Sequence, residues 1–215
     1  MSFERRWLNQ VGSEDCQGQA LWALGLCVAQ AGRGSFQMLA ERLFEQALPE
    51  AAKFTSPRSW AFTLIGIDEY LRRFGGDRRA NHIRDALTAK LMQRYADAAT
   101  PDRHWFEEVV SYANAKLRHA MILNGRCLKS TTMLELGLKT LRWLINAQTS
   151  GAGSFRPVGS NGFYPRGMAR AIFDQQPIEA KPRFPPALRL ITPRATCSGW
   201  RKHAGRSSGF SDAMT

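Results

Sequence analysis

The sequence predicts an all-α fold built from helical hairpins. Apolar residues recur every three or four positions through most of the first 180 residues, which is the pattern of amphipathic helices. Glycine and proline lie between these segments, where helices begin and end. No stretch alternates apolar and polar residues for long enough to form a sheet.

The first pair of helices is delimited by a capping serine and by glycines. Ser13 is expected to cap the first helix, with two acids in the first turn, where the helix dipole favours them. Gly32 and Gly34 are expected to end this helix. A second helix is expected over residues 36–52.

The second pair opens with the sequence SPRSW. Ser56 is expected to cap the third helix, and Pro57 fits its first position. Gly75 and Gly76 end this helix, and a fourth is expected over residues 77–95.

The third pair is expected over residues 106–123 and 128–147. The glycine-rich stretch 150–167 then predicts a loop or a short hairpin. A seventh helix is expected to begin at Pro177.

The openings of the odd-numbered helices are regularly spaced. Ser13, Ser56, Trp105 and Asp174 lie roughly 43–69 residues apart, as in an array of helical hairpins. A single hairpin cannot bury its apolar face, so such hairpins stack as a solenoid or close into a ring.

The net charge of +12 is unevenly distributed. Residues 181–215 hold seven of the Lys and Arg residues and one Asp, which accounts for half of that charge. The first 180 residues mix both signs, as a solvated surface does. A nucleic-acid partner is therefore not expected of this region.

We expect neither a membrane span nor a secretory signal in this sequence. It has no run of about 18 apolar residues, and its N-terminus lacks an apolar core. The four cysteines lie far apart, without CxxC or Cys/His ligand spacing. We therefore expect a cytoplasmic protein without a metal ion or another cofactor.

Each odd-numbered helix begins in a polar or aromatic cluster, and these clusters converge if the odd helices form an inner layer. Carboxylates and amides bind sugar hydroxyls, aromatic rings stack on sugar rings, and paired carboxylates cleave glycosides. The acid/base candidates are Glu14, Asp15, Glu107, Glu108 and Asp174. The candidates for binding hydroxyls are Arg58, Asn114, Gln175, Gln176 and Glu179. The candidates for stacking are Trp105, Tyr112 and Phe163.

A structural interpretation of some of these residues stays open. Acids in a first helical turn are equally expected to serve the cap and the dipole, which applies to Glu14 and Asp15. Trp22 and Trp143, at helical spacing, are expected in the core.

Four strings resemble bacterial proteins of the six-hairpin glycosidase-like superfamily, often described as glycosyltransferases or as their partners. They are SEDCQGQALWALG, SPRSWAFTLIGIDEYL, HWFEEVVSYANAKLRHAMILNG and GSFRPVGSNGF…FDQQPIEA. The resemblance covers about residues 1–180. It implies part of an (α/α)6 toroid and a carbohydrate role, but no catalytic assignment.

The sequence departs from the family at both ends. Members have more chain before the segment that matches MSFERRWL and further hairpins after DQQPIEA. We therefore expect residues 1–180 to be a partial toroid domain and the chain to be a fragment. The exposed helix faces of such a fragment predict self-association.

Residues 181–215 have four prolines, no capping pattern and no sustained apolar stripe. They are interpreted as an irregular, disordered basic tail. One alternative is that the tail binds nucleic acid. The favoured alternative is that the reading frame shifts near residue 181.

The expected function is therefore that of a carbohydrate-active enzyme acting on a glycoside or oligosaccharide. Hydrolysis, phosphorolysis and transfer all remain open, and so does activity of the fragment itself. The alternative is a non-catalytic helical scaffold that binds a glycosyltransferase partner.

Overall fold

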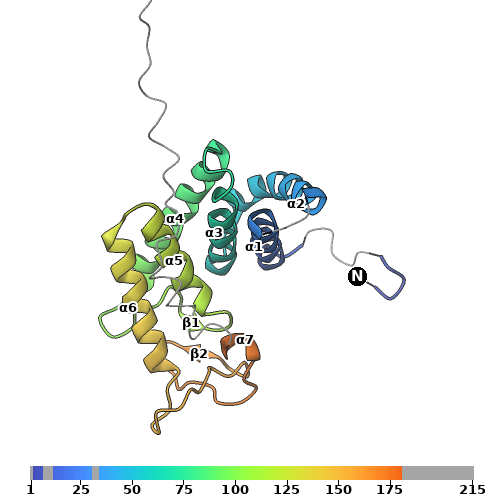
Figure 1. Cartoon of the computed structure of the whole chain (residues 1–215). Coiled ribbons are helices and arrows are strands. Elements are labelled where there is room, and N and C mark those ends of the chain that lie inside the picture. The colour runs from blue at the N-terminus through green and yellow to red at the C-terminus, as the bar shows by residue number, and fades with distance from the viewer. Residues whose placement is uncertain (1, 7–11, 31–33, 181–215) are drawn as a thin grey trace, which may run out of the picture.

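The structure is a computed structural model that describes residues 2–6, 12–30 and 34–180 (Figure 1). The predicted tail of residues 181–215 lies outside this part of the chain, as does Gly32. The described residues are mostly helical, which confirms the all-α prediction. No helix among them combines the length and apolar character needed to cross a bilayer.

The helices follow one another as antiparallel pairs. Their bounds are α1 (Glu14–Gln30), α2 (Gly34–Ala47), α3 (Pro57–Leu71), α4 (Arg78–Ala98), α5 (Ala115–Cys127), α6 (Thr131–Ala147) and α7 (Pro177–Ala180). A 3-10 helix, η1 (Leu48–Lys53), continues α2. The second predicted helix therefore changes type at Leu48, directly before a proline.

The pairs form an array in two layers. Helix α3 packs between α1 and α5, and each of these three helices also packs on the even-numbered helix that follows it (Figure 1). Side chains of α3 are buried at every position except Asp68. The odd-numbered helices thus form one layer with α3 at its centre.

Glycines allow α1 and α3 to approach closely. A Cβ atom on Gly25 would lie 2.1 Å from the carbonyl oxygen of Gly66. A Cβ atom on Gly66 would lie 2.5 Å from the carbonyl oxygen of Leu21. Neither position can therefore hold a larger residue without moving a backbone.

Residues 106–114 are not the start of a helix, so the predicted beginning of the fifth helix is wrong. They contain β1 (Val109–Val110), which pairs antiparallel with β2 (Tyr164–Pro165). Ala113 has a φ of 51°, which is outside the range of a right-handed helix, and α5 therefore begins only at Ala115.

An arginine anchors this short ribbon to α6. Arg103 donates from Nη2 to the backbone oxygens of Glu108 and Tyr164, at 3.0 and 3.3 Å. Its guanidinium lies 5.3 Å from the ring centre of Trp143 and 5.2 Å from that of Tyr164. The predicted loop of residues 150–167 is thereby held against the helical array.

Candidate functional site

Arg58 is the centre of a polar cluster at the beginning of α3. The side chain is buried, and its Nε donates to the Tyr112 backbone oxygen at 2.7 Å. Nη1 pairs with the Glu107 carboxylate, at 2.6 Å from Oε1. Nη2 donates to Oδ1 of Asn114 at 3.3 Å. One planar guanidinium therefore joins α3 to three residues that precede α5.

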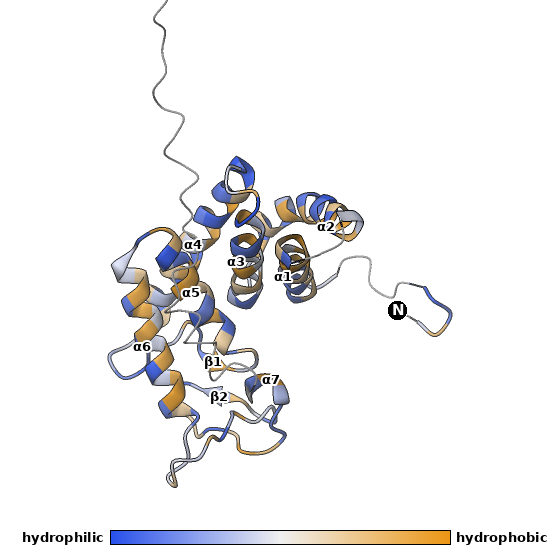
Figure 2. Cartoon of the chain, viewed as in Figure 1, coloured by the Kyte–Doolittle hydropathy of each residue, from blue (hydrophilic) through white to orange (hydrophobic). Residues whose placement is uncertain are grey.

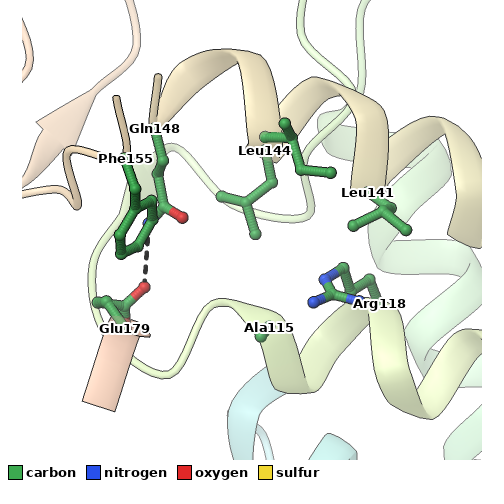
Figure 3. A pocket seen from close by; sticks show the side chains of 8 residues that line it. Ala115, Arg118, Leu141, Leu144, Gln148, Phe155 and Glu179 are labelled. Atoms are coloured by element: carbon green, nitrogen blue, oxygen red, sulfur yellow. Dashed lines mark hydrogen bonds between the residues drawn. The ribbon is translucent and has the colours of Figure 1, made fainter. Parts of the chain in front are cut away.

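Glu179 extends the cluster from α7. Its Oε2 accepts from Nδ2 of Asn114 at 2.8 Å and from Nε2 of Gln148 at 3.1 Å (Figure 3). Its Oε1 accepts from the Asn114 backbone N–H at 3.4 Å. Asn114 and Glu179 are both buried, so α7 is fixed to the residue that directly precedes α5.

Asp15, in the first turn of α1, faces the same cluster. Burial raises the pKa of the Tyr112 hydroxyl, and the nearby negative charge of Asp15 raises it further. Oδ2 of Asp15 accepts from Gln19 at 2.6 Å, and the Tyr112 hydroxyl also interacts with this carboxylate. The cluster's three carboxylates are thus held differently: Asp15 by Gln19 and Tyr112, Glu107 by Arg58, and Glu179 by Asn114 and Gln148.

Trp22 and Lys116 continue this surface along α1 and α5. Trp22 is seven residues after Asp15 on α1, so the two share a helix face, and Lys116 is the second residue of α5. Nζ of Lys116 lies 3.4 Å from the centre of the Trp22 ring, which stacks on Phe62. Trp22, expected in the core, is half-buried and packs against the core.

The structure thus brings together six of the predicted residues from four segments of the chain. They are Asp15, Arg58, Glu107, Tyr112, Asn114 and Glu179. We call these six residues the rim cluster. Gln148 is an additional partner that the sequence did not indicate, because it is an ordinary polar residue at a helix end.

Other predicted site residues lie elsewhere. Trp105 is fully buried, with its ring centre 5.7 Å from that of Trp143, so it belongs to the core and offers no stacking surface. Phe163 packs partly against the same core. Glu108 is exposed and pairs with Arg166 at 3.0 Å, outside the rim cluster.

Three further candidates lie in the exposed segment before α7. Asp174 has a φ of 56°, and its backbone oxygen accepts from the backbone N–H and the hydroxyl of Ser160. Gln175 donates to the backbone oxygen of Ile172 at 3.1 Å, and Gln176 is exposed. The Gln176 backbone oxygen accepts from the Glu179 N–H at 3.1 Å, but the side chains of all three residues are exposed, so we do not include them in the rim cluster.

Glu14 acts as a cap rather than as part of the rim cluster. Its Oε2 accepts from the backbone N–H groups of Thr55 and Ser56, both at 2.8 Å, and its Oε1 accepts from the Thr55 hydroxyl at 3.1 Å. The Ser56 side chain makes no capping hydrogen bond, so the predicted serine cap of α3 is wrong. Both oxygens of Glu14 are committed to the entry of α3.

This cap predicts a pH-dependent stability. Burial raises the pKa of Glu14, but the hydrogen bonds from Ser56 and Thr55 outweigh it and bring the pKa below 4.5. The stabilisation is therefore present above pH 4.5 and is lost as the pH falls through the folded-state pKa. Glu14→Gln should lower the free energy of unfolding by about 1 kcal/mol at pH 7.

Urea unfolding of both proteins at pH 7 and pH 3 measures this effect. The difference between wild type and Glu14→Gln should shrink at pH 3, while Glu135→Gln, on an exposed part of α6, should match wild type at both values. An undiminished difference at pH 3 would contradict the carboxylate cap.

A small pocket adjoins the Glu179 end of the cluster (Figure 3). Glu179, Gln148 and Phe155 lie on one side of it, and Leu141 and Arg118 lie on the other. Burial lowers the pKa of Arg118 to about 10. Among the described residues, no group of three or more His, Cys, Asp or Glu side chains could hold a metal ion.

Comparison with known proteins identifies no relative of this chain. No protein-family model matches it, and neither the characterised proteins nor the solved structures include a significant match. The fold and the cluster define the chain as an all-α array of helical hairpins with a polar cluster at the beginnings of its odd-numbered helices.

Proposed function

We propose that this chain binds a carbohydrate at the rim cluster and belongs to a glycoside-acting enzyme of the (α/α)6-toroid class. The observation that carries the proposal is the convergence of six polar residues from α1, α3, the segment before α5, and α7. Buried, mutually fixed polar groups are pre-organised to bind hydroxyls, because they need little reordering when the ligand arrives.

The carboxylates of the rim cluster differ in the partners that already bind their oxygens. Arg58 holds Glu107, and Asn114 and Gln148 hold Glu179. Asp15 is bonded to the exposed Gln19 side chain and interacts with the Tyr112 hydroxyl, a group with which it can exchange a proton. We therefore assign the proton-transferring role to Asp15, with the Tyr112 hydroxyl beside it, and we assign Arg58 and Asn114 to positioning.

The aromatic ring closest along α1 to Asp15 is already covered by other side chains. Nζ of Lys116 lies 3.4 Å from the centre of the Trp22 ring and Phe62 stacks on that ring, so the proposal rests on the polar residues and not on Trp22. Hydrolysis, phosphorolysis and transfer all use such a site with an acidic residue, and the proposal covers each of them.

The scaffold alternative places the polar clusters on an outer face for a glycosyltransferase partner. Their joining into one cluster at the starts of the odd-numbered helices weighs against it. A nucleic-acid function rests on residues 181–215, outside the described part of the chain.

A glycan array followed by calorimetry on the best ligand tests the proposal. Asp15→Asn keeps the size of the side chain but removes its charge, and it should weaken binding at least tenfold, since charged hydrogen bonds contribute about 1.5–3 kcal/mol. Asp97→Asn, on the exposed side of α4, is the matched control and should bind like wild type. Absence of glycan binding by wild type, or equal binding by Asp15→Asn, would contradict the proposal.

A further inference from the structure

Both oxygens of the Glu179 carboxylate accept hydrogen bonds from the protein. Oε2 accepts from Nδ2 of Asn114 and Nε2 of Gln148, and Oε1 accepts from the backbone N–H of Asn114. Glu179 is only 6% exposed. Helix α7 lies at the end of the array where α5 begins, and hydrophilic residues are visible on both helices there (Figure 2). Glu179 is therefore placed to hold Asn114 rather than to reach a ligand.

The side-chain amide of Asn114 is held in one orientation. Nδ2 donates to the Glu179 carboxylate at 2.8 Å and to the Ser111 backbone oxygen at 3.0 Å. Oδ1 accepts from Nη2 of Arg58 at 3.3 Å. Rotating the amide by half a turn would place Oδ1 against two acceptors and Nδ2 against a guanidinium, which can only donate. The negative charge of Glu179 makes the reversed orientation still less favourable.

The amide thereby connects a buried cation to a carboxylate on a different helix. Arg58 donates to Asn114, and Asn114 donates to Glu179, so both hydrogen bonds point from the cation toward the carboxylate. Glu107 binds the same guanidinium at Nη1. Buried hydrogen bonds in such a chain strengthen one another, because each polarises the next. The Arg58 guanidinium is thus held at Nη1 by Glu107 and at Nη2 by Glu179 acting through Asn114.

We propose that Glu179 is a positioning residue, which fixes the Asn114 amide and, through it, the guanidinium of Arg58. The sequence predicts that Glu179 binds sugar hydroxyls, and its contacts favour this indirect role instead. The positioning exists in the ligand-free protein and can be measured there. It rests on the proposed function only for its consequence, which is that loosening Arg58 weakens carbohydrate binding at the rim cluster.

Nuclear magnetic resonance of the ligand-free, 15N-labelled full chain tests this positioning. Exchange with water is measured for Nε–H of Arg58 and for the Nδ2 hydrogens of Asn114. Glu179→Gln keeps the size of the side chain, but its NH2 group must face an N–H donor of Asn114 in either orientation. Both exchange rates should therefore rise about tenfold or more. Rates equal to those of wild type would overturn the proposal.

Two further variants separate positioning from the attachment of α7. Gln148→Ala removes the bond between α6 and Glu179 but leaves Asn114 bonded, so both rates should stay within about twofold of wild type. Glu179→Asp keeps both acceptor oxygens and should raise the rates less than Glu179→Gln does. An effect of Gln148→Ala as large as that of Glu179→Gln, or a larger effect of Glu179→Asp, would contradict the proposal. Far-ultraviolet circular dichroism verifies that each variant is folded.

A glycan array distinguishes this inference from the proposed function. If wild type binds a glycan, Glu179→Gln should weaken that binding together with its effect on the Arg58 exchange rate. No glycan binding by wild type, with faster Arg58 exchange in Glu179→Gln, would reject the proposed function and support the positioning. Glycan binding by wild type, with unchanged Arg58 exchange in Glu179→Gln, would reject the positioning and support the proposed function.

Discussion

Arg58→Ala should destabilise the protein by about 3–5 kcal/mol, because it leaves the partners of a buried cation without their donor. The Arg58 and Glu107 side chains are only 6% and 17% exposed. Removing the guanidinium deprives the Glu107 carboxylate, the Asn114 side chain and the Tyr112 backbone oxygen of hydrogen bonds at once.

Urea-induced unfolding followed by circular dichroism measures this loss. Arg94→Ala, on an exposed part of α4, is the matched control and should change the free energy of unfolding by less than about 0.5 kcal/mol. Arg58→Lys should fall between wild type and Arg58→Ala, because an ammonium group keeps the charge but not the planar fork. A loss for Arg58→Ala no larger than that for Arg94→Ala would show that the buried pair does not hold the rim cluster together.

Gly66→Ala should destabilise the protein by about 3 kcal/mol or more, because the added methyl group overpacks two backbones. The new Cβ atom would lie 2.5 Å from the Leu21 carbonyl oxygen and 2.9 Å from Cα of Trp22. Backbone atoms cannot turn away as a flexible side chain can, so α1 and α3 must separate. That separation would also displace Asp15 from Tyr112.

Thermal unfolding provides the measurement, with Gly34→Ala as the matched control. A Cβ atom on Gly34 meets no atom within 4 Å, and alanine favours a helix over glycine, so this variant should be unchanged or slightly more stable. Equal melting temperatures for Gly66→Ala and wild type would contradict the close contact of α1 with α3.

The helices could be predicted from the sequence wherever local signals decide the structure. The Ser13 hydroxyl accepts from the Cys16 N–H at 3.2 Å, as its capping position predicts. Asp77 likewise caps α4, accepting from the Ala80 N–H at 3.0 Å. The spacing of apolar residues is also a local signal, because it indicates which face of a helix is buried, and it predicted the approximate positions of α1 to α6.

Features that depend on distant contacts could not be predicted in this way. The cap of α3 comes from Glu14, which precedes Thr55 by 41 residues. The late start of α5 depends on pairing of β1 with residues 164–165. Trp105 lies beside polar residues in the sequence, yet its ring packs in the core.

The rim cluster could be predicted from the sequence only in part. The hairpin spacing predicts that the odd-numbered helices share a layer, and six of the thirteen candidates meet there. The spacing does not indicate which carboxylates are engaged by cations, caps or amides. That distinction, which selects Asp15, requires the three-dimensional contacts.

Chemical-shift mapping tests the central claim most directly. A 15N-labelled sample of the full chain is titrated with the oligosaccharide that the glycan array selects, and each backbone amide is followed. We expect the changes to concentrate at Asp15, Arg58, Tyr112 and Asn114, and to disappear in Asp15→Asn. Changes confined to the α2 or α4 surface, or none at millimolar ligand, would show that the rim cluster does not bind carbohydrate.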